Sequence, residues 1–314
     1  MRTAEAPQDI VMVAIDEPSI RRLGPYPWPR SVAARAIDTI AAAHPKAIAL
    51  DVLYAGPTDP ADDTALARSV AGAGNVVAAA QMDDSRTWIL PIPEIAQTAA
   101  ALGHVNVDKD ARGEDRDLTV HLSDTAGRSI RPLALETVLA GGGAAARNSV
   151  NAVTIAIDYL PARFNALSIA DVVEGRRPPS DFAGKYVLIG ATAPSLGNRI
   201  VTGPRREPMT GVEVLANAVN TILRSRFYSE TRDINQVLCA AVIAVFVLIM
   251  FQLIGRRIIL QIAVLLVGVA AIWGAGAFSI SRLVYPPMTA ELVSFVLAAA
   301  LALAWKPRGS ANHV

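Results

Sequence analysis

The chain has very little cysteine and histidine, the residues on which many catalytic and metal sites depend. Among its 314 residues Cys239 is the only cysteine, which excludes a disulfide framework or a cysteine-based metal site within one chain. The four histidines, His44, His104, His121 and His313, are scattered, and neither GxSxG nor HExxH is present. Histidine- or cysteine-centred catalysis therefore has little support.

The sequence also has no excess of charge of one sign, because it contains 29 basic and 28 acidic residues and no basic block stands out. This balance disfavours nucleic-acid binding through an electrostatic footprint. The first ten residues, MRTAEAPQDI, contain no apolar run that could act as a signal peptide or an anchor. We expect that a preceding span has been lost by truncation or a wrongly assigned start; the alternative is a cytoplasmic domain with inverted topology.

What the sequence does have is apolar residues concentrated in its last quarter. Residues 234–254, 258–280 and 287–305 each have the length of a membrane span. Buried helices of a soluble core would need 63 apolar-rich residues with a single carboxylate, so this alternative is disfavoured. That carboxylate, Glu291, is a candidate intramembrane site, or else a side chain in interfacial water at a helix N-terminus.

Basic residues at the ends of these stretches predict their orientation, because such residues prefer the cytoplasmic side. Arg256 and Arg257 separate the first two spans, and Lys306 and Arg308 follow the third. We therefore expect a domain of residues 1–230 outside the cytoplasm and a membrane segment of residues 231–314 with a short cytoplasmic tail. The chain would then be a multi-pass protein of the bacterial inner membrane, in contact with the lipid bilayer.

The first domain has the alternating pattern of an α/β protein. Apolar strands at 10–16, 46–52 and 75–81 alternate with helices at 31–44 and 62–71, which predicts a mainly parallel sheet flanked by helices. Residues 102–124 predict an inserted antiparallel hairpin, and residues 131–142 a helix. Strands at 152–158 and 185–192 then resume the alternation. A helix at 211–225 leads to the first of three transmembrane helices.

Three of these apolar strands end in an aspartate, namely Asp16, Asp51 and Asp158. Ligand sites form outside the carboxyl ends of parallel strands, so the three acids could line one pocket for a cation or a polar ligand. Alternatively, each caps the turn that follows it. No general base or nucleophile stands out beside them, and we expect no catalytic residue, metal or cofactor.

The stretch Pro27-Trp28-Pro29 follows the first strand and precedes the helix at 31–44. The prolines predict an extended segment, and Ser31 is the expected N-cap of the helix. We expect Trp28 to pack as an apolar lid whose indole N–H needs a partner. Arg30 could meet Asp16 or Asp51, either as a structural ion pair or as one wall of a pocket.

Several motifs in fixed order resemble one known family. They are VAIDEPSIRRLGPYPWPRSVAARAIDTI, AIALDVLYAGPTDPADDTALA, GNVVAAA, ALGHVNVDKDARGEDR, GKYVLIGATAPSLGNRIVTGP and MTGVEVLANAVNTIL. Together, over residues 9–223, they are similar to the type-two CHASE domain, an extracellular sensory domain of bacterial receptors. The charged run DKDARGEDRD is longer than the glycine-containing DxDG turn that is common in the family.

The resemblance implies an extracytoplasmic input domain, normally with one span before it and three after it, that controls a cytoplasmic cyclase or kinase. Here no preceding span is present and nine residues follow Trp305, so the output enzyme is expected outside this chain. We expect a homodimer that responds to an unknown small-molecule or physical stimulus. The expected ligand-binding residues are Asp16, Trp28, Arg30, Asp51, Asp158 and Thr192.

Two other functions compete with the sensory one. A divalent cation on the strand-end aspartates would make the domain an extracytoplasmic hydrolase. Alternatively, the chain could be a membrane scaffold for a separately encoded signalling enzyme.

Overall fold

The computed structural model describes most of the first 224 residues and a few later ones. The described ranges are 7–109, 115–143, 154–160, 163–196, 201–202 and 208–224, with short pieces at 229–230, 245–246, 249–250, 266, 268, 284–285 and 295. By its internal contacts the chain separates into two units, Met1–Phe227 and Tyr228–Val314.

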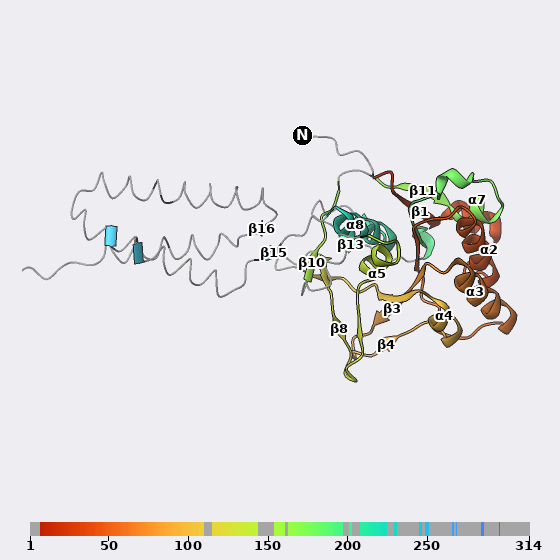
Figure 1. Cartoon of the computed structure of the whole chain (residues 1–314), viewed down its shortest axis with the longest axis horizontal. Coiled ribbons are helices and arrows are strands. Elements are labelled where there is room, and N and C mark those ends of the chain that lie inside the picture. Colours follow the sequence, from red (N-terminus) through yellow and green to blue (C-terminus); the bar gives the residue numbers. More distant parts are fainter. Residues whose placement is uncertain are drawn as a thin grey trace, which may run out of the picture. The chain divides into compact units, whose positions relative to one another are not determined.

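A seven-stranded sheet forms the centre of the first unit (Figure 1). Its order is β11-β1-β12-β2-β3-β4, and β5 also pairs with β3. Every pairing except that of β3 with β4 is parallel. The strands are β1 (Ile10–Ile15), β2 (Ala47–Asp51), β3 (Val76–Met82), β4 (Trp88–Ile89), β5 (Ala101–His104), β11 (Asn165–Ser168) and β12 (Tyr186–Ala191).

The predicted mainly parallel sheet is thus confirmed, and its strands are apolar throughout because both faces are covered. All six residues of β1 are buried, as are the first five of β12. Although β12 comes late in the chain, it lies between β1 and β2, with Met12 and Ala49 opposite Leu188 on its two sides.

Helices cover both faces of this sheet (Figure 1). One face packs against α2, α3, α4 and α7 in one apolar cluster, and the other against α5 and α8 in a second cluster. The helices are α1 (Glu17–Leu23), α2 (Arg30–Ala41), α3 (Pro60–Ala73), α4 (Pro93–Thr98), α5 (Leu133–Ala140), α7 (Ile169–Val173) and α8 (Gly211–Leu223). Short 3-10 turns lie at Pro179–Asp181 and Pro194–Leu196.

The start of α2 differs from the prediction. The helix begins at Arg30, and Pro29 occupies the N-cap position with an extended backbone, so Ser31 is not the cap. Proline presets the φ angle at this position, and Val32 N–H already bonds to the Pro29 carbonyl. By contrast, α3 has the usual signals, with Asp59 as N-cap, Pro60 in the first turn and Gly74 at φ +69° after the end.

The expected hairpin at 102–124 is right only in part. Residues 101–104 form β5 of the central sheet, and the antiparallel pair consists of β6 (Asp108–Lys109) and β7 (Asp115–Thr119). The strand expected at 152–158 is β10 (Thr154–Ala156), which pairs antiparallel with β7 in this small sheet instead of joining the parallel one. Its alternating pattern allows either sheet, and only long-range pairing decides between them.

The other strands of the first unit lie at the edge of the central sheet or form short separate pairs. The edge strand β11 was not predicted, because its residues NALS are partly exposed and lack an apolar run. The remaining short strands are β8 (Leu122–Ser123), β9 (Ser129–Ile130), β13 (Val201–Thr202) and β14 (Pro208–Met209), paired β8 with β9 and β13 with β14.

In the second unit, β15 (Ser229–Glu230) and β16 (Val284–Tyr285) form a parallel pair. Phe295 is buried, and its ring lies against Gly268. The apolar side chains of Val245, Phe246, Ile249 and Leu266 are each more than half exposed. No helix within the described part of the chain has the length and hydropathy of a membrane span. Most of the three predicted spans, and Glu291, lie outside that part.

Candidate functional site

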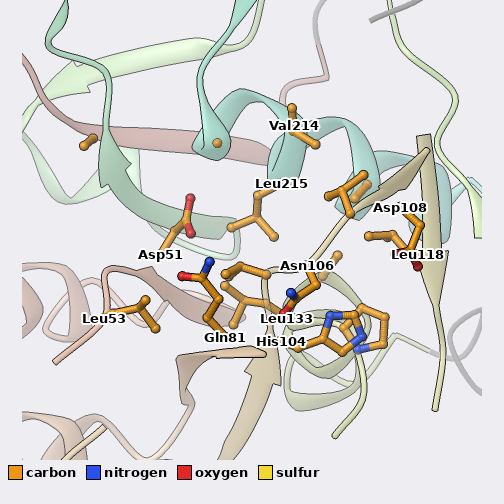
Figure 2. Close-up of a pocket in the computed structure, with 17 residues that line it drawn as sticks. Asp51, Leu53, Gln81, His104, Asn106, Asp108, Leu118, Leu133, Val214 and Leu215 are labelled. Carbon is orange, nitrogen blue, oxygen red and sulfur yellow. The ribbon is translucent and has the colours of Figure 1, made fainter. Parts of the chain in front are cut away.

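A cavity of about 360 Å³ lies at the carboxyl edge of the central sheet. Asp51 at the end of β2, Gln81 near the end of β3 and His104 at the end of β5 contribute its polar floor, while α5 and α8 form apolar walls. In Figure 2, Asp51 and Gln81 point into the same space, and Leu215 reaches toward them from α8. Parallel strands end at one edge, so the topology itself gathers these side chains.

The first turn of α8 is held close to this edge. The Glu213 carboxylate accepts hydrogen bonds from the backbone N–H and the hydroxyl of Thr210, at 2.8 and 3.0 Å. This interaction resembles one half of a capping box. Glycine at 190 lets the helix approach, because a Cβ there would lie 2.7 Å from the Cβ of Val212. A Cβ on Gly211 would lie 3.4 Å from Asp51 Oδ2.

Asp51 is the unusual acid of the cavity. Its side chain is only partly exposed, and no hydrogen bond or ion pair reaches its carboxyl from any residue that the structure describes. Burial disfavours the charged form and raises the pKa of Asp51 to about 6. A carboxyl without a partner beside a cavity is available to a ligand.

His104 is buried, with 1% of its surface exposed. Its Nε2 lies 2.8 Å from the Thr119 carbonyl oxygen, which assigns the ring proton to Nε2. Desolvation lowers the pKa of His104, although its bond to Thr119 and the charge of Asp108 oppose this effect. Nδ1 is buried and has no hydrogen-bond partner among the described residues.

The other polar side chains of the cavity differ in how far they are satisfied. The Asn106 carboxamide exchanges two hydrogen bonds of 2.8 Å with the backbone of Met82. One oxygen of Asp108 accepts from the Thr119 hydroxyl at 2.8 Å. Gln81 makes no side-chain hydrogen bond within the described ranges. Asn106 is thus structural, whereas Gln81 and Asp108 retain free capacity.

Asp158 does not lie at this edge but belongs to the segment that follows β10. The backbone N–H of Asp158 donates to Thr221 Oγ1, and that of Leu160 donates to Asn217 Oδ1, both at 2.9 Å. These bonds tie the segment to the buried side chains of α8. The expectation that Asp158 would share a parallel-sheet edge with Asp16 and Asp51 is therefore wrong.

Asp16 has the capping role that was the alternative to ligand binding. Its carboxyl accepts from the Ser19 backbone N–H at 2.9 Å, from the Ser19 hydroxyl and from the Ser168 hydroxyl at 2.9 Å, and it caps α1. Thr192 follows β12, and its backbone N–H bonds to Ile15 at 3.0 Å. Neither side chain lines the cavity. Because β12 separates β1 from β2, Asp16 and Asp51 end strands that are not neighbours.

Trp28 packs beside the apolar cluster of α2, α3, α4 and α7, away from the cavity. Its indole N–H donates to the Gly24 carbonyl at 2.7 Å, which supplies the expected partner. The ring meets Tyr26 edge-on, with 5.3 Å between the centroids, and the Tyr26–Pro27 peptide bond is cis.

Arg30 is buried and paired, but not with Asp16 or Asp51 as expected. Its Nη1 lies 2.9 Å from Asp63 Oδ1, and Nη2 donates to the Gly56 carbonyl. The guanidinium also lies 5.3 Å from the centroid of the Tyr54 ring. Asp63 comes from α3, so the pair joins two helices through tertiary packing that no local pattern encodes. Arg30 is thus a structural residue.

Of the predicted ligand residues, then, only Asp51 lines the cavity. Over the described residues, no three side chains of His, Cys, Asp and Glu come together as a metal site. The sequence reasoning missed Gln81, His104 and Asp108 as lining residues. Gln81 and His104 lie at or near the ends of apolar strands, and this position is the one sequence feature that could have predicted them as lining residues.

Comparison with known families settles the membership of the chain. The model of the CHASE2 domain matches residues 1–255. The chain belongs to the CHASE2 family. CHASE2 domains are sensory domains of the extracellular side, so the resemblance noted in the sequence is confirmed. No curated protein and no solved structure matches the chain.

We expect Arg30→Ala to destabilise the CHASE2 domain by about 3 kcal/mol, because it leaves the Asp63 carboxylate buried without its partner. Arg35→Ala, on the exposed side of the same helix, is the matched control and should change stability by less than about 0.5 kcal/mol. The measurement is urea unfolding of the full chain in detergent, followed by tryptophan fluorescence. Equal effects of the two variants would contradict the structural role.

We expect Asp51→Asn to stabilise the CHASE2 domain in a pH-dependent way. The pKa of Asp51 is about 6 in the folded state and about 4 in an unfolded chain. The wild type therefore loses stability as the pH rises between these values, whereas the amide does not titrate. The variant should equal the wild type below about pH 4 and exceed it by on the order of 2 kcal/mol at pH 7.5.

The same unfolding measurement at several pH values tests this expectation. Asp38→Asn, at an exposed carboxyl on α2, is the control, and its difference from the wild type should stay within about 0.5 kcal/mol. A difference for Asp51→Asn that is constant with pH would show that burial does not perturb this carboxyl.

Proposed function

We propose that the chain is the extracytoplasmic sensory input module of a bacterial transmembrane receptor. In this proposal it passes an external stimulus to a cytoplasmic output enzyme, a cyclase or kinase. The supporting observation is that α8 both lines the cavity and is the last described helix of the first unit, Met1–Phe227. Membership of a sensory family supports the same function.

The cavity end of α8 contributes Gly211, Val214, Leu215 and Ala218. The helix ends at Leu223, four residues before the boundary between the two units at Phe227. A ligand in the cavity would therefore contact the element that leads out of the sensory unit. Such a ligand shifts the receptor between states only if it binds one position of α8 more tightly than another.

The second unit would supply the membrane segment. Its three apolar stretches have spanning length, and four apolar side chains that the structure describes there are more than half exposed, as side chains facing lipid would be. The basic residues at 256–257, 306 and 308 favour a cytoplasmic C-terminus. In a homodimer, movement of α8 would pass through the membrane segment to a partner enzyme.

The proposed topology predicts which cysteines a membrane-impermeant maleimide can label. With Cys239→Ser as background, a cysteine in place of exposed Asp38 should react on intact cells, whereas one in place of Ser310 should react only after lysis. The variants are made at the chromosomal locus, so that the protein is tested as the cell makes it. If only the cysteine at position 310 is labelled on intact cells, the topology is the opposite of the proposed one and the proposal is refuted.

The proposed coupling predicts that filling the cavity moves α8. Leu215→Trp adds bulk to the cavity wall. The distance is measured between spin labels at two exposed positions, Asp38 on α2 and Arg224 after α8. We expect the substitution to shift the distribution of this distance. Ile89→Trp, on the short strand β4 and outside the cavity lining, is the control and should leave the distribution unchanged. If Leu215→Trp also leaves it unchanged, the chain acts as a fixed scaffold.

A further inference from the structure

The polar groups around the cavity can accept hydrogen bonds but have few donors facing them. The Asp51 carboxyl has no partner among the described residues, and Asp108 uses only one oxygen. His104 also lines the cavity, and its buried Nδ1 lacks a hydrogen bond within the described ranges. Neither lysine nor arginine belongs to the described lining. The cavity is therefore complementary to a ligand that brings donors and positive charge.

The walls are apolar, which limits the kind of cation that fits. Leu133 from α5 and Val214 and Leu215 from α8 face the cavity. Its volume, about 360 Å³, lies within the range of small-molecule sites. A bare metal ion would need several oxygen or nitrogen ligands in one place, and no three His, Cys, Asp or Glu side chains of the described residues come together. An organic cation uses both the carboxyl and the walls.

We propose that this cavity binds a small organic ammonium, whose charged head pairs with Asp51 and whose apolar body packs against Leu133, Val214 and Leu215. The head donates hydrogen bonds to the Asp51 carboxylate, and the Gln81 carboxamide points into the same space (Figure 2). This inference rests on the proposed sensory function, for which it names the class of stimulus.

The position of Asp51 also links binding to α8. Its Oδ2 lies beside Gly211, the first residue of the helix, where a carboxylate is attracted by the positive end of the helix dipole. An ammonium that pairs with Asp51 neutralises the carboxylate and weakens this attraction. Binding thereby favours a different position of the helix.

Binding requires the ionised carboxylate, so affinity depends on pH. Burial raises the pKa of Asp51 to about 6. The affinity should therefore fall about tenfold between pH 7.5 and pH 5. The other titratable groups that face the cavity from the described residues are His104 on β5 and Asp108 on β6. Glu213, in the first turn of α8, is engaged with Thr210.

The test is calorimetric titration of the full chain in detergent with cyclohexylmethylammonium at pH 7.5. Cyclohexylmethanol and cyclohexanecarboxylate have the same ring with a neutral or a negative head. We expect the ammonium to bind at least tenfold more tightly than either. Asp51→Asn, an isosteric change, should weaken its binding at least tenfold, and the control Asp38→Asn should not change it.

An ammonium affinity equal to or below that of the alcohol or the carboxylate overturns the inference, as does unchanged binding by Asp51→Asn. The spin-label distance between positions 38 and 224 separates this result from the proposed function. If the ammonium binds through Asp51 but the distance does not change, the ligand class is right and the coupling is wrong. If Leu215→Trp shifts the distance but no ammonium binds, the coupling is right and the ligand class is wrong.

Discussion

The close approach of α8 to the central sheet is the constraint on which the rest of the site depends. A Cβ at Gly190 would lie 2.7 Å from the Cβ of Val212, so only glycine lets the helix begin so near the strand. This contact brings the first turn of α8 beside Asp51. It also leaves Leu215 to form one wall of the cavity.

The same helix is held from its other side by the segment after β10. Asn217 and Thr221 are buried polar residues within α8, and they accept hydrogen bonds from the backbone of that segment. Buried amide and hydroxyl groups are stable when they are paired in this way. The helix therefore cannot shift without altering contacts on both of its sides.

Two buried acids of the domain show how structural and ligand-binding roles differ physically. Burial alone would raise the pKa of Asp63, but hydrogen bonds from Thr58 and the charge of Arg30 outweigh it and lower that pKa. Asp51 has no such partner among the described residues, and burial dominates. A satisfied acid stabilises the fold, whereas an unsatisfied one beside a cavity is open to a ligand.

Local pattern determined the elements and the family of this protein. Apolar runs predicted β1, β2, β3 and β12, the helices expected at 131–142 and 211–225 correspond to α5 and α8, and the ordered motifs predicted a CHASE2 domain. Asp51 was also foreseeable, because it ends a parallel strand. Only the tertiary structure shows that β12 lies between β1 and β2, that β10 belongs to the small sheet, and that Arg30 pairs with Asp63. These choices depend on contacts between residues far apart in the chain, which the periodicity of a single segment does not encode.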